Sequence, residues 1–427
     1  MAISTQPYKG TRDFYPEQKR LQDYIFTIWR QVAESFGYEQ YNAPIIESLE
    51  LYLAKTSEEI VNEQTYAFTD RGGRQVTLRP EMTPTVSRMI AGRRQEIPFP
   101  ARWFSIPNLW RYERPQRGRL REHWQLNVDL FGVSGPAAEH ELILLADTIM
   151  QKFGAQRDMY SIRLNSRKLV NFVLSEILDL EDTLITQTIR LIDRMHKMDK
   201  TDFCKALEEI INSKKTEQLS EILHTKNIND LPEDIKSHPS VKELHDLEVM
   251  LARSKITNAS FDITLMRGFD YYTDIVFEIF DNNPQNNRSM FGGGRYDGLV
   301  GQFGVEPIST VGFGMGDVVL QDFLEVHGLL PKLETSVDID VVLIGDVYAA
   351  AQQLVKDLRD AGLRTAVDSS GRKMEKQIKS AVKAGYPYVL FVGQAELDEG
   401  LYNLKDLKTS QEDRLNIKEI IDRFMPA

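Results

Sequence analysis

The sequence contains a single cysteine, Cys204, among 427 residues. One thiol excludes an internal disulfide and any metal site built from several thiolates, and it suits a reducing compartment. No apolar run approaches the roughly 18 residues that a membrane-spanning helix needs. The first residues, MAISTQPYKGTRDFYP, are polar and interrupted by proline, unlike a secretory signal peptide. We therefore expect a cytoplasmic protein with no membrane contact.

Positive charge is also scarce. Lysine and arginine total 52 against 63 acidic residues, which gives a formal net charge of −11. This balance argues against non-specific nucleic-acid binding over the whole surface, so any such contact must come from a local basic patch. The length of 427 residues and the apolar fraction of 42% predict two or three domains with cores of their own.

The spacing of apolar residues predicts the domain organisation. Residues 1–325 mix helices with hairpins, around Asp70–Gly73 and within 110–132, and with strands at 260–265 and 275–280. This pattern predicts an α+β domain with a mostly antiparallel sheet. Within it, residues 168–255 are rich in helix formers and predict a helical insertion. Residues 326–336 predict a linker. Strands alternate with helices in residues 337–427, which predicts a small α/β domain with a largely parallel sheet.

The most informative stretch is WRYERPQRGRLREHWQLNVDLFG, residues 110–132. Its two ends have strand character, and proline and glycine between them predict a loop, so we expect two antiparallel strands joined by an arginine-rich loop. The loop carries Arg111, Arg114, Arg117, Arg119 and Arg121. Guanidinium forks pair well with phosphate oxygens, which favours a polyphosphate ligand. The alternative is an ordinary solvated, charged hairpin.

Two further sets of polar residues are candidates for a ligand site. Glu81 and Thr83 stand at a predicted strand-to-helix junction, where side chains commonly face a cleft; the alternative is helix capping. A glycine turn brings together the guanidinium of Arg267, the acid Asp270 and the phenolic hydroxyls of Tyr271 and Tyr272. Their alternative is a loop with two tyrosines that pack against the core.

Glycines mark two more segments. FGGGRYDG, residues 291–298, predicts flexible backbone around Arg295 and Tyr296, where a ligand can approach closely. TVGFGMG, residues 310–316, has the wrong spacing for a dinucleotide-binding loop and no βαβ unit after it.

A basic stripe is predicted in the last domain. Arg372, Lys376, Lys379 and Lys383 recur at helical spacing and fall on one helix face. In an acidic protein such a stripe is a candidate nucleic-acid surface, and the alternative is a solvated helix face.

Together these segments resemble the histidyl-tRNA synthetase family, which belongs to the class II aminoacyl-tRNA synthetases. GYEQYNAPIIE resembles the first class II motif, which builds a homodimer interface in that class. RYERPQRGRLREHWQLNVDLFG resembles the second motif. RGFDYYTDIVFE and FGGGRYDGL resemble two stretches specific to the histidine enzyme. The resemblance covers nearly the whole chain and implies a class II catalytic domain over residues 1–325 and an anticodon-binding domain over residues 337–427.

The resemblance also implies roles for individual residues. The expected contacts to ATP come from Arg111 at the α-phosphate, Glu113 by the adenine, and Arg119 and Arg121 near ATP and the tRNA acceptor end. The expected contacts to histidine come from Glu81 and Thr83 at the amino group and from Asp129 and Tyr272 at the imidazole. Gln125 is expected to help fix the amino acid, Tyr296 to line the imidazole pocket, and Tyr271 to belong to the same binding site. Arg267 is expected to act with Arg111 in catalysis as a fixed cation at the α-phosphate.

One position departs from the class pattern. The third class II motif usually contains an arginine that grips the ATP tail, but Val319 stands at this position and Asp317 adds an acid nearby. Another cation must then serve the phosphates, and Arg114 and Arg295 are the sequence candidates.

The resemblance implies a histidine–tRNA ligase that uses ATP and Mg²⁺, with tRNA(His) and histidine as substrates and no metal held by protein side chains alone. The basic stripe is then a candidate contact to tRNA. The alternative is a regulatory subunit of ATP phosphoribosyltransferase, built on the same fold without aminoacylation, which the missing arginine would suit. A third possibility is a synthetase-like RNA-binding sensor without chemistry.

Overall fold

The computed structural model describes residues 3–53, 64–266, 272–286 and 289–425. The chain divides into two compact units, Met1–Leu330 and Pro331–Ala427, and each is described by itself. In the described residues, no helix is long and apolar enough to cross a membrane.

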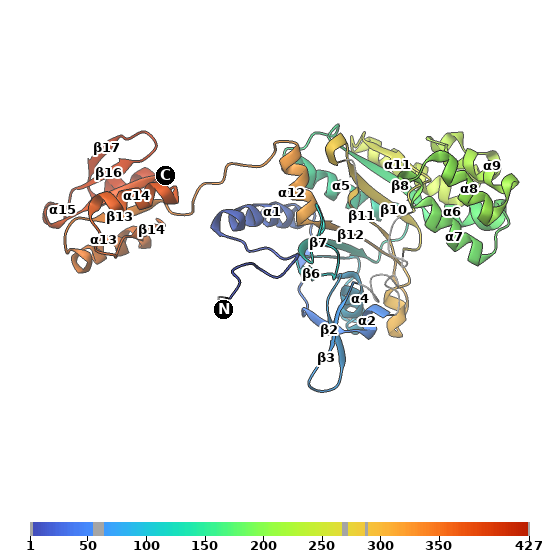
Figure 1. The fold of residues 1–427 in the computed structure, drawn as a ribbon, viewed down its shortest axis with the longest axis horizontal. Coiled ribbons are helices and arrows are strands. Elements are labelled where there is room, and N and C mark those ends of the chain that lie inside the picture. The colour runs from blue at the N-terminus through green and yellow to red at the C-terminus, as the bar shows by residue number, and fades with distance from the viewer. Residues whose placement is uncertain (1–2, 54–63, 267–271, 287–288, 426–427) are drawn as a thin grey trace. The chain divides into compact units, whose positions relative to one another are not determined.

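A nine-stranded sheet forms the centre of the first unit (Figure 1). Its order is β1-β5-β7-β12-β11-β10-β8-β9, with β6 paired to β7. Pairing is antiparallel except between β1 and β5 and between β8 and β9, so the predicted mostly antiparallel sheet is confirmed. The strands are β1 (Glu39–Gln40), β5 (Ala101–Ser105), β6 (Asn108–Trp110), β7 (Glu122–Phe131), β8 (Tyr160–Ser166), β9 (Ala259–Phe261), β10 (Ile275–Asp281), β11 (Ser289–Arg295) and β12 (Thr310–Gly316).

Helices α1 (Pro16–Ser35), α5 (Ala137–Lys152) and α12 (Asp317–Val326) help to bury one face of this sheet. Proline at the first turn of α1 suits a helix start, because its missing N–H has no partner there in any case. Ile25, Trp29 and Val32 recur at helical spacing and are buried in the core, where the Trp29 indole N–H lies 3.1 Å from the Met315 sulfur. The opposite face of the sheet is left for a ligand site.

A three-stranded sheet lies beside the large one, with the order β2 (Ile46–Ser48), β4 (Gln75–Leu78) and β3 (Tyr66–Thr69). The predicted hairpin is confirmed, since Asp70 Oδ1 accepts from the backbone N–H groups of Gly72 at 2.8 Å and Arg74 at 2.9 Å across the turn. Helices α2 (Glu50–Leu53) and α4 (Thr83–Gly92) complete this region.

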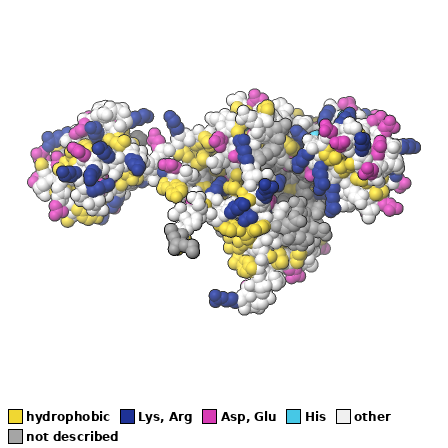
Figure 2. Space-filling model, viewed as in Figure 1, with side chains coloured by type: hydrophobic (Ala, Val, Ile, Leu, Met, Phe, Trp, Pro, Cys, Tyr) yellow, Lys and Arg dark blue, Asp and Glu magenta, His cyan; other side chains and the backbone are white. Residues whose placement is uncertain are grey.

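The predicted helical insertion connects β8 to β9. Its elements are α6 (Arg167–Phe172), a π-helical turn (Val173–Ile177), α7 (Asp182–Ile192), 3₁₀ turns (Met195–Lys197 and Ile228–Asp230), α8 (Lys200–Ile211), α9 (Ser213–Leu223), α10 (Glu233–Lys236) and α11 (Pro239–Arg253). Apolar side chains of these helices join the same core as the sheet. Figure 2 shows basic and acidic side chains interspersed on the visible face of this module.

The second unit contains a five-stranded sheet with the order β14-β13-β15-β16-β17. Strands β14 (Thr365–Val367), β13 (Ile339–Leu343) and β15 (Tyr388–Val392) are parallel as predicted. Two strands were not predicted, β16 (Tyr402–Asp406) and β17 (Glu412–Leu415), and both are antiparallel. The helices are α13 (Tyr348–Asp360), α14 (Met374–Ala384), α15 (Gln394–Glu399) and α16 (Ile417–Phe424).

Two predictions in the first unit were wrong. The strand expected at 260–265 ends at Phe261, because the following residues form a turn in which Asp262 Oδ1 accepts from Thr264. The glycines of 291–298 are not a flexible loop but lie largely in β11. A Cβ on Gly293 would stand 2.1 Å from the Gly312 carbonyl oxygen, so glycine serves the close approach of β11 to β12.

Candidate active site

Strand β7 supplies one wall of a pocket on the open face of the sheet. Its side chains alternate, as strand geometry requires: Leu126 and Val128 enter the core, while Gln125, Asn127 and Asp129 face the other way. Gln125 and Asn127 are also linked, since the Asn127 side-chain amide lies 3.2 Å from the Gln125 carbonyl oxygen. Asn127 was not predicted, although the same alternation would have placed it beside its two predicted neighbours.

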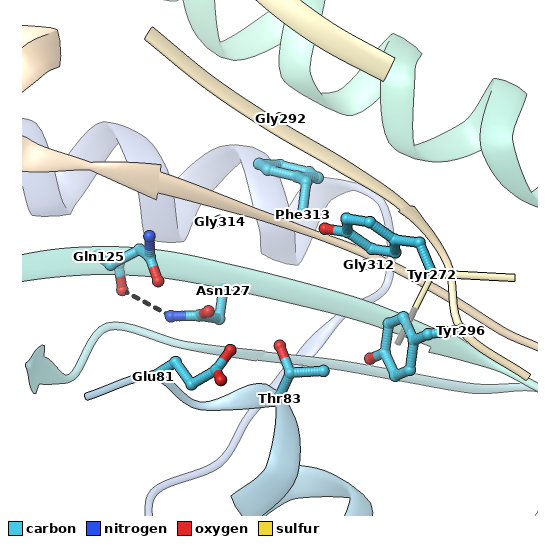
Figure 3. Close-up of a pocket in the computed structure, with 10 residues that line it drawn as sticks. All are labelled: Glu81, Thr83, Gln125, Asn127, Tyr272, Gly292, Tyr296, Gly312, Phe313 and Gly314. Carbon is cyan, nitrogen blue, oxygen red and sulfur yellow. Dashed lines mark hydrogen bonds between the residues drawn. The ribbon is translucent and has the colours of Figure 1, made fainter. Parts of the chain in front are cut away.

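The pocket holds about 380 Å³ of empty space and gathers residues from distant parts of the sequence (Figure 3). Five predicted histidine contacts line it together: Glu81, Thr83, Gln125, Tyr272 and Tyr296. In Figure 3, Glu81 and Thr83 form one side, Gln125 and Asn127 lie along β7, and the two tyrosines stand at one end.

Glycines of β12 make room for the pocket. A Cβ on Gly312 would lie 2.2 Å from Asp129 Oδ1, and one on Gly314 would lie 2.8 Å from the Gln125 side chain. Any other residue at either position would displace the polar side chains of β7. The glycines therefore leave the space that the carboxylate and the amide of β7 occupy.

Asp129 is a buried acid of the site with a perturbed pKa. It is 3% exposed, and its Oδ1 accepts a hydrogen bond from the Tyr296 hydroxyl. Its Oδ2 is buried and has no hydrogen-bond partner among the described residues. Burial raises the pKa of Asp129 to about 7, against the opposing effect of the Tyr296 hydrogen bond. A buried carboxyl with a vacant oxygen is costly unless a ligand donor meets it.

Glu81 and Thr83 stand where β4 leads into α4. The capping alternative is not supported, because the N-cap of α4 is Met82, which makes no side-chain capping bond. Glu81 is 2% exposed, and the Tyr52 hydroxyl lies 3.4 Å from its carbonyl oxygen. Both side chains line the pocket.

The arginine loop, residues 111–121, borders this site and connects the antiparallel strands β6 and β7 as predicted. Arg111 Nε donates to the Pro80 carbonyl at 2.9 Å, and its guanidinium stands 4.0 Å from the Glu113 carboxylate. Arg121 donates through Nε to the Glu113 carbonyl and through Nη1 to the Tyr8 hydroxyl. Arg119 is exposed. The loop thus carries fixed cations beside the pocket.

His123 is a residue of this region that was not predicted. Burial, together with the positive charges of Arg111 and Arg12, lowers its pKa to about 3. The imidazole is therefore neutral at physiological pH. Its position two residues before Gln125 puts it on the same strand face, which was the available sequence signal.

Comparisons with known proteins agree with this geometry. A family model for histidyl-tRNA synthetase matches residues 10–316, and a model for an anticodon binding domain matches residues 338–425. A histidine–tRNA ligase of Leptospira biflexa is 41% identical over 429 residues, which cover 99% of this chain and 98% of that protein. The chain belongs to the histidyl-tRNA synthetase family.

Solved structures confirm the fold. The crystal structure of histidyl-tRNA synthetase from Nostoc sp. PCC 7120 has a TM-score of 0.83 at 23% identity and covers 99% of this chain and 100% of that one. An ATP phosphoribosyltransferase regulatory subunit/histidyl-tRNA synthetase from Bacillus halodurans C has a TM-score of 0.74 at 21% identity, covering 92% and 99%. At these identities the likeness shows the fold and does not separate the two activities.

One sequence candidate for the phosphate cation in this synthetase family member was wrong. Arg295 is 4% exposed and forms a bidentate ion pair with Glu139 at 2.7 and 2.8 Å. It also donates to the Gly135 carbonyl at 2.8 Å. Its donors are occupied inside the protein, so it anchors the strand end that carries Tyr296 and does not serve ATP.

The basic stripe needs a correction as well. Arg372 precedes α14, and its guanidinium bonds to Asp368, Ser370 and Ser380 within the second unit. The exposed cations of the helix itself are Lys376, Lys379 and Lys383.

Arg267 and Tyr271 lie outside the described residues. In the described part of the chain, no group of three or more His, Cys, Asp or Glu side chains is arranged to hold a metal ion.

Proposed function

We propose that this chain is a histidine–tRNA ligase, which activates histidine with ATP and transfers it to the 3′ end of tRNA(His). The observation that carries the proposal is the vacant Oδ2 of Asp129, buried beside a pocket whose other side presents Glu81 and Thr83. An amino acid with an N–H donor at the far end of its side chain would pair with this oxygen, and its α-amino group would pair with Glu81 and Thr83.

The pocket chemistry favours imidazole over other side chains. Neutral imidazole carries one donor and one acceptor nitrogen. The Asp129 carboxyl is proposed to receive the N–H, and the hydroxyl of Tyr272 to meet the other nitrogen. Glu81 and Thr83 would bind the α-amino group, with Gln125 along the side of the substrate. An apolar amino acid would leave these buried groups unpaired, which allows strong discrimination without editing.

Activation is proposed as attack of the histidine carboxylate on the α-phosphate of ATP, which yields histidyl-adenylate and pyrophosphate. Such a displacement needs alignment and fixed positive charge rather than covalent help from the protein. Arg111 would hold the α-phosphate, since its link to the Pro80 carbonyl fixes it next to Glu81. Arg267 would join it, as the family resemblance implies. Glu113 would lie by the adenine, with Arg119 and Arg121 near the nucleotide.

Magnesium would arrive with the nucleotide, because phosphate oxygens are preferred Mg²⁺ ligands and the described side chains offer no cage of their own. When bound, it would neutralise phosphate charge.

Transfer to tRNA would use both units. The second unit matches the anticodon binding domain model, and the exposed cations of α14 are proposed to contact the tRNA backbone. We also propose a cytoplasmic homodimer that pairs through the region of β1, a two-residue edge strand in the segment that resembles the first class II motif.

The competing function is a regulatory subunit that binds histidine without activating it. Val319, in place of the usual arginine, favours it. Histidine-dependent exchange of pyrophosphate into ATP, measured without tRNA, separates the two. Exchange with histidine and with no other amino acid supports the ligase. Absence of exchange, with histidine binding still seen by calorimetry, would move the assignment to the regulatory subunit.

A further inference from the structure

The segment Tyr8–Phe14, here called the N-terminal arm, runs along the arginine loop before α1 begins (Figure 1). The Gly10 carbonyl accepts the backbone N–H of Arg121 at 2.8 Å. Gly10 has φ +88°, and a Cβ there would stand 2.8 Å from the Arg121 side chain and 2.9 Å from Pro115. The arm and the loop therefore fit together without space for a side chain between them.

Two residues beyond Gly10, the arm delivers a cation to the start of α12. Arg12 Nη2 lies 2.6 Å from Asp317 Oδ2, in the first turn of that helix. The other oxygen of Asp317 accepts the Trp124 backbone N–H at 2.9 Å, which fixes the carboxylate against β7. Asp317 is the acid that the third motif adds, and Val319, two residues later, occupies the position of its missing arginine.

Arg12 keeps donors for a ligand. Its side chain is 22% exposed, and its Nε is buried without a hydrogen-bond partner in the described structure. The guanidinium lies 4.9 Å from the Phe14 ring centre and 6.0 Å from that of Trp124, which holds its plane in place. A planar guanidinium can bind a carboxylate on one edge and a phosphate on another.

The charge of Arg12 also reaches the proposed nucleotide site. Arg12 and Arg111 both help to lower the pKa of the His123 imidazole, so both cations lie within electrostatic reach of one side chain. Arg111 is the residue proposed for the α-phosphate. Arg12 is therefore a second fixed cation near His123, in addition to Arg111. A second cation suits the remaining phosphates of the same nucleotide.

We propose that Arg12 is an ATP-binding residue that replaces the missing third-motif arginine by contacting the phosphate tail, and that Asp317 is its positioning residue. The cation then comes from the N-terminal arm instead of from α12, and the helix contributes the acid that holds it. This inference rests on the proposed use of ATP.

The test compares variants by histidine-dependent pyrophosphate exchange. Arg12→Gln is expected to raise the KM for ATP by about 10- to 100-fold, the range for loss of a charge-assisted hydrogen bond, with the KM for histidine unchanged. The matched control is Arg157→Gln, since Arg157 pairs at 2.7 Å with the buried Asp147 and its side chain is 31% exposed. The control is expected to leave both constants unchanged. An unchanged KM for ATP in Arg12→Gln would overturn the proposal.

A second-site substitution distinguishes a direct contact of Arg12 with ATP from a purely structural role in supporting the arginine loop. Arg12→Gln combined with Val319→Arg restores a cation to the usual position and is expected to recover most of the lost ATP affinity. A purely structural role of Arg12 could not be restored by an arginine at position 319. A double variant that is folded but does not recover ATP affinity therefore counts against the proposal. Arg12→Lys, which keeps the charge but loses the fork, is expected to show an intermediate KM for ATP.

A binding measurement keeps the outcome independent of turnover. By calorimetry, Arg12→Gln is expected to weaken binding of ATP and to leave binding of AMP unchanged, because AMP lacks the tail. Equal loss for both nucleotides would assign Arg12 to support of the loop instead. If the unmodified chain shows no exchange, the proposed ligase function fails, while the comparison of ATP with AMP still decides the role of Arg12.

Discussion

The buried carboxyl of Asp129 gives a prediction in which stability and substrate binding oppose each other. Its pKa is raised from 3.8 to about 7, chiefly by burial. At about 1.4 kcal/mol per tenfold change, the folded protein bears a cost of about 4 kcal/mol for holding this group ionised. Between about pH 4 and pH 7 the folded protein keeps a proton that the unfolded chain has lost. Stability therefore falls as pH rises through this window, and the full cost is present above it.

Asp129→Asn should remove most of this cost at pH 8, because asparagine stays neutral and can still accept from the Tyr296 hydroxyl. A gain of about 2–4 kcal/mol is expected. With about 2.1 cal/mol/K of unfolding entropy per residue, the unit Met1–Leu330 should then unfold roughly 3–6 °C higher. At pH 5.5, midway through the window, only about half of this cost is present, so the same substitution should raise the midpoint by about half as much.

The assay is thermal unfolding at both pH values, run beside histidine-dependent exchange. The variant should gain stability at pH 8 and lose histidine binding, since its neutral amide is a poorer acceptor for imidazole. Asp147→Asn is the matched control. Asp147 is 1% exposed but paired with Arg157 and Tyr160, so its loss should destabilise at both pH values. An Asp129→Asn protein that unfolds at a lower temperature at pH 8 would refute the reasoning.

Three further predictions follow from the site and the second unit. Gly312→Ala should raise the KM for histidine by about 100-fold or more, because its methyl would collide with Asp129, whereas Gly92→Ala, with open space around it, should have no effect on exchange kinetics. Glu139→Gln should destabilise the first unit by about 3–5 kcal/mol in denaturant unfolding, since it leaves the Arg295 guanidinium buried without its counter-charge; an unchanged midpoint would show that the pair is relaxed in solution. Three lysines of α14 are to be replaced together by glutamine: Lys376, Lys379 and Lys383. This replacement should weaken tRNA binding and flatten its salt dependence without changing pyrophosphate exchange. Unaltered tRNA affinity would show that these lysines do not contact tRNA.

Sequence reasoning worked where local periodicity decides structure. The alternation in β7 predicted which face of the strand carries Gln125 and Asp129, and the turn chemistry around Asp70 predicted the hairpin. The pocket brings together five of the predicted histidine contacts, although 215 positions separate Glu81 from Tyr296. These residues could be predicted as one site only from the family resemblance, because spacing along the sequence does not show which distant residues meet.

The errors have a common physical origin in tertiary contacts. The glycines of 291–298 were expected to be flexible, but β12 approaches β11 so closely that a strand there tolerates no side chain at Gly293. Arg295 looked available for phosphate, and only the fold shows Glu139 facing it. The partnership of Arg12 with Asp317 joins residues 305 positions apart and leaves no local signal in the sequence.

The parallel pairing of β8 with β9 has a consequence for shortening the chain. Ile162 pairs with Ala259 and Leu164 with Phe261, both in the same direction. Neighbouring strands that run in the same direction cannot be joined by a tight turn, because the chain must return along the full strand before it can re-enter the sheet. A truncation that joins the end of β8 directly to β9 would therefore dismantle this sheet edge. A minimal catalytic unit must keep a crossover of about a dozen residues or more in place of the helical module.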